Sequence, residues 1–299
     1  MTAPTTERLT LTKIHGCAND YLFVDCTKRA PLERADEIAR IVSDRRRGVG
    51  ADGLILIYPS RKADFRMEMY NADGGRGEMC GNGIRGLGKY VADRKMAHGD
   101  EVAVETDCGV KKLTLFRNRA GLVERVTVDM GMPIIEGRKV PVDADGPVIG
   151  QPLEVAGRTW GVTCVSMGNP HCVTFDVDPD SMSEMELQVV GKQFESHPFF
   201  PARVNTEFIR VDAPDRLRMR VWERGSGETW ACGTGACASV VAGVLTKRCD
   251  RRATVVLNGG DLDIEYATDG CVRMTGPAEE VFTTTIDVAL GADAQARAV

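Results

Sequence analysis

Two of the ten cysteines in the sequence share one local context, because Cys80 and Cys232 are each followed by Gly-x-Gly. A small-residue stretch with helical character comes next in both places, so each thiol is expected at the start of a helix. Unpaired backbone N–H groups and the positive end of the helix dipole stabilise a thiolate there. The glycines let an anionic group approach those N–H groups closely. One such site predicts the binding of a carboxylate.

A pair of such thiols predicts a narrower chemistry, the inversion of a carbon next to a carboxylate. The proton must leave one face of the carbon and a proton must return to the other face, which requires two acid–base groups. Cys80 and Cys232 would be these groups, one as thiolate and one as thiol, in a cleft between two domains. Helix-terminal N–H groups would stabilise the extra negative charge of the intermediate. A single buried cysteine beside glycine is more often structural, so it is the repetition that favours function.

An internal repeat relates the two cysteines. A shift of 152 positions, the separation of Cys80 and Cys232, aligns residues 66–83 with residues 218–235 without a gap. The residues of the first copy that recur identically in the second are Arg66, Met67, Gly75, Cys80, Gly81 and Gly83. Two similar halves predict one domain over residues 1–132 and another over residues 133–279. The tail at 291–299 is expected to be disordered.

Each half shows the same order of elements. An alternating stretch (65–70, 217–222) predicts a strand, and a glycine-rich loop leads to a helix (84–92, 236–245). The second helix is apolar all round, which is typical of a helix buried on all sides. We therefore expect an α+β fold in which each domain is a curled, mostly antiparallel or mixed sheet around one central helix. Further strands are predicted at 54–57, 101–105, 122–130, 162–165, 204–211, 254–257 and 281–288, and outer helices at 33–43 and 183–194.

Composition excludes several other classes of function. The net charge is −5, and the basic run 45–47 is too short for a nucleic-acid tract. No signal peptide and no run of about 18 apolar residues is present, so no membrane partner and a cytoplasmic location are expected. The cysteines form no C-x-x-C pair and the four histidines stand far apart, so we expect no metal site.

Six motifs in the same order resemble the diaminopimelate epimerase family, over nearly the whole chain from Lys13 to about Val288. They lie at residues 14–20, 47–53, 70–83, 167–171, 204–207 and 222–235. The resemblance implies interconversion of LL- and meso-diaminopimelate in lysine and peptidoglycan-precursor synthesis, without pyridoxal phosphate or another cofactor. It also implies a homodimer, and a final strand (280–290) that returns to the first domain.

The resemblance assigns roles to particular residues. Cys80 and Cys232 are the two catalytic residues, with His171 and Glu223 in support. The residues expected to bind the amino-acid substrate are Asn19, Asn71, Gly81, Asn82, Asn169, Asn205, Glu223, Arg224, Gly233 and Thr234. Arginine with amide donors and acceptors suits the distant carboxylate and ammonium of diaminopimelate.

Some of these residues also have structural interpretations. Asn71 and Asn169 could stabilise turns, and Arg224 could form a surface pair with Glu223. His171 could be a satisfied core histidine. Two positions depart from the family pattern: Gly53 stands where some members have glutamine, and Gly86 stands where a larger residue is frequent.

Three other functions remain open at this stage. One is a two-cysteine racemase acting on proline or hydroxyproline. Those substrates lack the distant charged end, so Arg224 and the four asparagines would have no substrate group to bind there. A thiol redox protein would form a Cys80–Cys232 disulfide. A binding module of the same shape would lose nothing when either cysteine is replaced.

Overall fold

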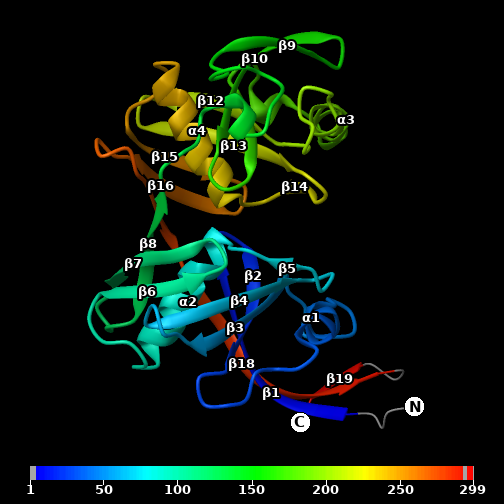
Figure 1. Cartoon of the computed structure of the whole chain (residues 1–299), viewed down its shortest axis with the longest axis vertical. Helices are drawn as coiled ribbons and strands as arrows, with labels where there is room; N and C mark the ends of the chain where they lie inside the picture. The colour runs from blue at the N-terminus through cyan, green and yellow to red at the C-terminus, as the bar shows by residue number, and fades with distance from the viewer. Residues whose placement is uncertain (1–4, 292–294, 299) are drawn as a thin grey trace. The chain divides into compact units, whose positions relative to one another are not determined.

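The structure is a computed structural model that describes residues 5–291 and 295–298 (Figure 1). The chain divides into two compact units, residues 1–128 with 277–299 and residues 129–276. The sequence analysis placed the corresponding boundaries at 132 and 280. In the described part of the chain, no helix is long and apolar enough to span a membrane.

The first unit is a mixed sheet with two helices. Its strands are β1 (Thr5–Gly16), β2 (Asn19–Asp25), β3 (Gly53–Pro59), β4 (Phe65–Asn71), β5 (Arg76–Gly77), β6 (Glu101–Thr106), β7 (Gly109–Arg117), β8 (Val123–Gly131, which runs past the boundary), β18 (Glu279–Leu290) and β19 (Gln295–Ala298). Its helices are α1 (Ala35–Ser43) and α2 (Gly81–Asp93). The pairs β2–β3 and β4–β6 are parallel, while β1–β2, β3–β4, β6–β7 and β7–β8 are antiparallel.

The second unit repeats this pattern. Its strands are β9 (Gln151–Val155), β10 (Arg158–Ser166), β11 (Pro170–Thr174), β12 (Asn205–Ala213), β13 (Arg216–Glu223), β14 (Gly227–Thr229), β15 (Arg252–Leu257), β16 (Gly260–Tyr266) and β17 (Val272–Pro277). Its helices are α3 (Glu184–Glu195) and α4 (Gly233–Leu245), with 3₁₀ turns at Gly137–Lys139 and Pro179–Ser181. Parallel pairs β11–β12 and β13–β15 again alternate with antiparallel pairs β10–β11, β12–β13, β15–β16 and β16–β17. The predicted repeat of an α+β unit is therefore confirmed.

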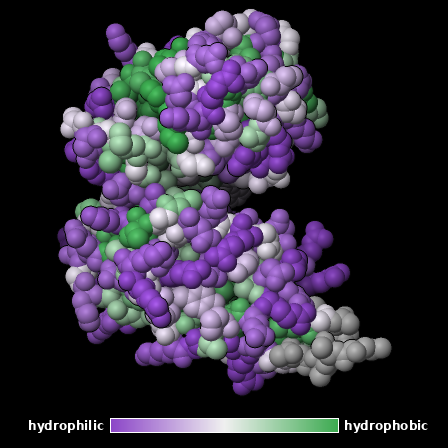
Figure 2. All heavy atoms as spheres, in the orientation of Figure 1, coloured by the Kyte–Doolittle hydropathy of each residue, from purple (hydrophilic) through white to green (hydrophobic). Residues whose placement is uncertain are grey.

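The helices α2 and α4 are the buried helices of their units, and Figure 1 shows each alongside strands of its own unit. Nearly every residue of α2 is buried, although it carries Arg85 and Lys89. Gly86 permits close packing, because a Cβ atom there would lie 2.6 Å from Cζ of the Phe23 ring on β2. The glycine that departs from the family pattern thus makes room for an aromatic side chain. Figure 2 shows hydrophilic side chains over much of the visible face of each unit.

The chain end differs from the sequence prediction in part. Residues 295–298 form β19, which pairs antiparallel with β18 through contacts such as Val288↔Ala296. Backbone hydrogen bonds to β18 give this segment a structure that its side chains do not predict. The remainder of the predicted disordered tail, residues 292–294 and 299, lies outside the described residues.

Candidate active site

Each of the two predicted cysteines is the N-cap residue of the buried helix in its unit. Cys80 precedes α2 with φ −127°, and Cys232 precedes α4 with φ −126°. The Cys232 thiol accepts a hydrogen bond from the Gly235 N–H at 3.4 Å, and the Thr234 hydroxyl lies 3.6 Å away. A helix N-terminus presents its first backbone N–H groups to whatever lies before it. Both helix starts can therefore receive an anionic group beside a thiol.

The Cys80 thiol meets an amide oxygen. Its Sγ atom lies 3.6 Å from Oδ1 of Asn19, the first residue of β2, and donates to it. The same oxygen accepts a hydrogen bond of 3.0 Å from the Asn82 side chain in the first turn of α2. The structure thus brings together Asn19, Cys80 and Asn82, three predicted site residues of the first unit.

The Cys232 thiol is almost completely buried, with 5% of its surface exposed. Burial raises the pKa of Cys232 well above its usual value, and the nearby carboxyl groups of Glu223 and Glu207 raise it further. The hydrogen bonds from Thr234 and Gly235 act in the opposite direction. Burial also raises the pKa of Glu223, against the lowering effect of a hydrogen bond from the Thr229 hydroxyl. This environment favours the protonated forms of Cys232 and Glu223.

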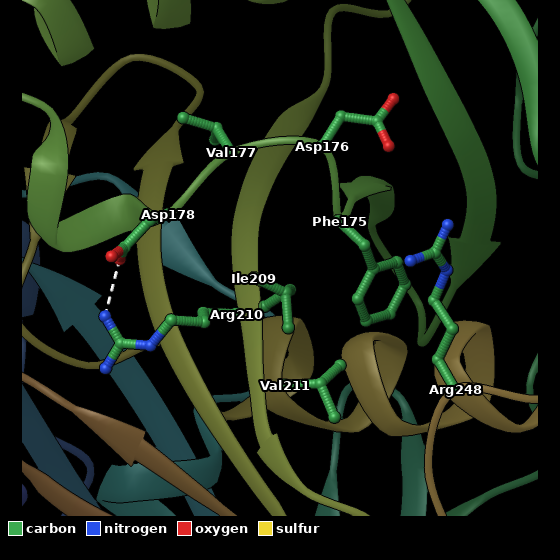
Figure 3. A pocket seen from close by; sticks show the side chains of 8 residues that line it. All are labelled: Phe175, Asp176, Val177, Asp178, Ile209, Arg210, Val211 and Arg248. Carbon is green, nitrogen blue, oxygen red and sulfur yellow. Dashed lines mark hydrogen bonds and ion pairs between the residues drawn. The ribbon is translucent and has the colours of Figure 1, made fainter.

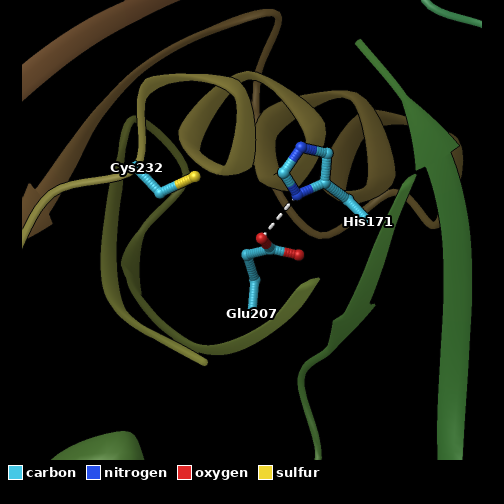
Figure 4. A group of neighbouring side chains, drawn as sticks. All are labelled: His171, Glu207 and Cys232. Carbon is cyan, nitrogen blue, oxygen red and sulfur yellow. Dashed lines mark hydrogen bonds and ion pairs between the residues drawn. The ribbon is translucent and has the colours of Figure 1, made fainter. Parts of the chain in front are cut away.

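His171 lies on β11 beside Cys232, as Figure 4 shows. Its Nδ1 atom is 2.6 Å from Oε1 of Glu207, and its Nε2 atom is 3.0 Å from Oδ1 of Asn169. His171 and Glu207 are both fully buried. His171 is thus satisfied by partners, as a core histidine would be, and it also lies next to the thiol.

Glu207 is the site residue that sequence analysis missed. The residue lay inside one of the six motifs but received no role. The available signal was an acid in the middle of the predicted strand 204–211, directly before Phe208 and Ile209, because a buried carboxylate requires a partner. Its second oxygen, Oε2, is buried and has no hydrogen-bond partner among the described residues.

His171, Glu207 and Cys232 also have the chemistry of metal ligands. Their nitrogen, oxygen and sulfur atoms lie within 4.8 Å of one another, and such a set suits zinc. The short hydrogen bond between Nδ1 of His171 and Oε1 of Glu207 explains the closeness of that pair without an ion. That the protein needs no metal and no cofactor stays a prediction.

Asn205, the first residue of β12, lies beside Arg224, which directly follows the last residue of β13. The buried Asn205 side chain accepts a hydrogen bond of 2.8 Å from the Arg224 backbone N–H. The Arg224 guanidinium is exposed and donates to the Ala202 carbonyl at 3.1 Å. No carboxylate binds it within the ranges that the structure describes, and Glu223 bonds Thr229 instead. Arg224 and Glu223 therefore do not form the surface pair that we considered.

The turn that follows β4 does not depend on the Asn71 side chain. Its backbone closes the turn, since the Asn71 N–H donates to the Gly75 carbonyl at 2.8 Å and the Gly74 N–H donates to Asn71 at 2.9 Å. Opposite Asn71 in the sheet lies Gly53. A Cβ atom at Gly53 would lie 2.3 Å from the Tyr70 carbonyl oxygen, so a glutamine does not fit here without a backbone shift.

A hollow of about 330 Å³ in the second unit contains none of the predicted site residues (Figure 3). Arg210 on its wall is paired with Asp178, Asp180 and Asp212. The guanidinium of Arg248 lies over the Phe175 ring, 5.1 Å from its centre. Because these charges already have partners, we do not assign the site to this hollow.

Replacing Glu223 by Gln is expected to lower catalytic turnover by about 10²-fold and yet to raise thermal stability near neutral pH. A carboxyl whose pKa is raised on folding contributes most stability at low pH, and this contribution is lost as the pH rises through its folded-state pKa. Glutamine stays neutral, so the variant should melt higher than the parent near neutrality and respond less to acidification. Melting curves across the acid to neutral range check this. An equal pH response in both proteins would contradict it.

Comparison with known proteins shows the family of this chain. The family model described as diaminopimelate epimerase matches residues 11–136 and 163–281. A protein of that name from Agathobacter rectalis is 50% identical over 289 residues, 93% of this chain and 99% of that protein. Another, from Methanococcus maripaludis, is 46% identical over 281 residues, 93% of this chain and 99% of that protein.

Solved structures show the same fold at low identity. A hydroxyproline epimerase from Agrobacterium vitis superposes with a TM-score of 0.69 at 13% identity, covering 97% of this chain and 93% of that one. A phenazine biosynthesis protein of the PhzF family from Bacillus anthracis gives a TM-score of 0.66 at 16% identity, covering 93% and 99%. These likenesses establish the fold alone. The family model and the relatives at about half identity go further, and by them this chain belongs to the diaminopimelate epimerase family.

Proposed function

We propose that this protein interconverts LL- and meso-diaminopimelate by removing the proton of one α-carbon with one thiolate and returning a proton to the opposite face from a second thiol. The observation that carries the proposal is the matched pair of cysteine N-caps, Cys80 on α2 and Cys232 on α4, in a chain of this family. Two such thiols supply the two opposed acid–base groups that inversion requires.

The reaction begins when one cysteine, as thiolate, removes the α-proton from its face of the carbon. The electron pair left behind spreads into the adjacent carboxylate, and the other cysteine delivers its thiol proton to the opposite face. In the direction in which Cys232 is the acid, it starts as the thiol, the form that its surroundings favour. The net change is inversion at carbon, with one thiol gaining a proton and the other losing one.

The backbone N–H groups at the two helix starts would hold the reacting carboxylate. Gly81 and Asn82 begin α2, and Gly233 and Thr234 begin α4. Donors fixed before the reaction stabilise the developing charge without reorganising, which contributes on the order of 3–4 kcal/mol for each donor where it has been measured. Glu223 would support this step by accepting from the substrate ammonium, and His171 by holding Glu207 beside Cys232.

The distant end of the substrate would explain the remaining polar residues. It carries a carboxylate and an ammonium, and the Arg224 guanidinium has donors free for the carboxylate. The amide side chains that would hold the substrate, including this end, are Asn19, Asn71, Asn169 and Asn205. Proline and hydroxyproline lack this end, so we propose diaminopimelate over either of them.

The location, oligomeric state and pathway are proposed from the sequence and from the family resemblance. We propose that the protein works in the cytoplasm, as a homodimer, in the synthesis of lysine and of peptidoglycan precursors. Its partner is the amino-acid substrate, without nucleic acid, membrane or cofactor.

The test is an assay on metal-stripped protein without added cofactor, with LL-diaminopimelate in heavy water. Thiol protons exchange with the solvent, so the meso product should carry deuterium at the inverted carbon. Product that keeps the substrate hydrogen there would contradict thiol acid–base chemistry. Activity on proline with none on diaminopimelate would contradict the substrate.

A further inference from the structure

A chain of side-chain hydrogen bonds in the first unit runs from a carboxylate to the Cys80 thiol. The Asp52 Oδ2 atom accepts a bond of 2.6 Å from the Asn19 side-chain nitrogen. The oxygen of the same amide accepts from Asn82 at 3.0 Å and from Cys80 at 3.6 Å. The Asn82 oxygen in turn accepts a bond of 2.9 Å from the Arg85 guanidinium.

The charged groups at the two ends fix the direction of every bond in this chain. A carboxylate only accepts, so the Asn19 nitrogen must face Asp52 and its oxygen must face Cys80. A guanidinium only donates, so the Asn82 oxygen must face Arg85 and its nitrogen must face Asn19. The two ends therefore favour the same orientation of the Asn19 amide, Asp52 through a charge-assisted bond and Asn82 through a weaker neutral bond. In this orientation Asn19 can only accept from Cys80.

Asp52 is itself held in place. Its other oxygen accepts a bond of 2.9 Å from Arg45, and the Asp20 backbone N–H donates to Oδ2 at 3.1 Å. At the other end, Arg85 has no exposed surface and Asn82 has 4%. The amide of Asn19 is thus held between the fixed Asp52 carboxylate and the buried Asn82–Arg85 pair.

The second unit lacks this arrangement. Under the shift of 152 positions, Asn82 corresponds to Thr234 and Arg85 to Cys237. The Cys232 sulfur receives a hydrogen bond from the Gly235 N–H, whereas the Cys80 sulfur donates one to Asn19. The two halves therefore treat their thiols differently.

We propose that Asp52 is a positioning residue for Cys80, which acts by fixing the Asn19 amide with its oxygen toward the thiol. This inference rests on the proposed function for its catalytic meaning. Through Asn19, Asp52 presents an acceptor to the Cys80 S–H group and holds its proton at a defined place. Without the Asp52 carboxylate only the neutral bond from Asn82 holds this orientation, so the amide can turn more readily and offer its N–H₂ group to the sulfur.

The test is Asp52→Asn, with the alkylation of Cys80 by iodoacetamide followed by mass spectrometry of its peptide. Alkylation requires no substrate, so this measurement stands even if the protein proves to have another activity. Because the charge-assisted hold on the Asn19 amide is lost, we expect Cys80 to react about 3- to 10-fold faster at fixed pH. With diaminopimelate, kcat should fall about 10- to 100-fold in both directions, since the reacting group is no longer held in place.

The matched control is Asp20→Asn. Asp20 binds Arg45 and Lys13 in the same charged cluster, but its side chain does not contact Asn19. This variant should lose thermal stability and leave the Cys80 alkylation rate unchanged. If Asp20→Asn raises the alkylation rate of Cys80 as much as Asp52→Asn does, the cause is the altered charge of the cluster and the proposal is wrong.

Buried Cys17 and Cys26 report whether the first unit stays folded, because they have 2% and 0% exposed surface. If they also react in Asp52→Asn, the same comparison is made with Asn19→Ala, which removes the acceptor itself and should likewise accelerate Cys80. An unchanged Cys80 rate in a folded Asp52→Asn protein, or in Asn19→Ala, overturns the proposal.

Discussion

Cys80→Ala and Cys232→Ala should each lower the rate of LL-to-meso conversion by about 10⁴-fold. Acid–base groups that are correctly positioned contribute up to about this factor, and the remaining thiol can serve only its own face of the carbon. The measurement is conversion of LL-diaminopimelate followed with a stereospecific assay. Because both substitutions remove one atom at a helix N-cap, the fold should be retained, as melting curves would show.

The single variants should also separate exchange from inversion. A protein with only one thiol can remove the proton from one face and return a solvent proton to that same face. In heavy water each variant should therefore place deuterium in one stereoisomer without inverting it, and Cys80→Ala and Cys232→Ala should differ in which one. Exchange of both stereoisomers by one variant would show that a third base acts.

Two other cysteines provide controls for these variants. Cys108 in the first unit is exposed, and Cys271 in the second is partly buried. Cys108→Ala and Cys271→Ala should convert substrate at the parent rate. If Cys80→Ala and Cys232→Ala also kept the parent rate, the two thiols would not be the acid and base. A parent that bound diaminopimelate without converting it, with binding unchanged in both variants, would be a binding module. If oxidation of the parent raised its activity, a thiol redox function would replace the epimerase.

The central part of the fold could be predicted because local and repeated signals agree there. The Cys-Gly-x-Gly sequence, the alternating strand before it and the small residues after it occur twice at a fixed spacing. They placed both helix starts at the cysteines, where α2 and α4 begin. The outer helix α3 was also signalled locally, since Ser183 and Glu186 form a capping box at its start.

What could not be predicted depends on strand pairing between distant segments. Glu207 reaches His171 because β11 and β12 are parallel, with His171 opposite Asn205 and Glu207 two residues further on the same face. Asp52 reaches Asn19 in the same way, because β2 and β3 are parallel and Tyr21 lies opposite Gly53. Sequence identifies such residues as polar members of motifs, but the register of the sheet decides their partners.

Arg224→Ala is expected to give the second large effect, which is weaker binding of the substrate. Its guanidinium is exposed, carries no bound carboxylate in the parts of the chain that the structure describes, and is steadied by the Ala202 carbonyl. In the proposed complex the substrate covers this guanidinium, and removing one partner of a charge pair that is buried costs about 3–5 kcal/mol. We therefore expect kcat/KM for diaminopimelate to fall about 10²-fold or more, mainly through KM, with Cys80 and Cys232 still able to exchange protons.

Arg224→Lys distinguishes charge from geometry at this position. Lysine keeps the positive charge but loses the planar pair of donors that matches a carboxylate, so it should restore only part of the loss. Arg252, exposed and paired with Glu265 in the same unit, supplies the control, since Arg252→Ala should keep the parent KM. An Arg224→Ala protein with unchanged KM and kcat would remove Arg224 from the site. The case for a substrate with a charged distant end would weaken with it, because Arg224 is the cation that this case assigns to the distant carboxylate.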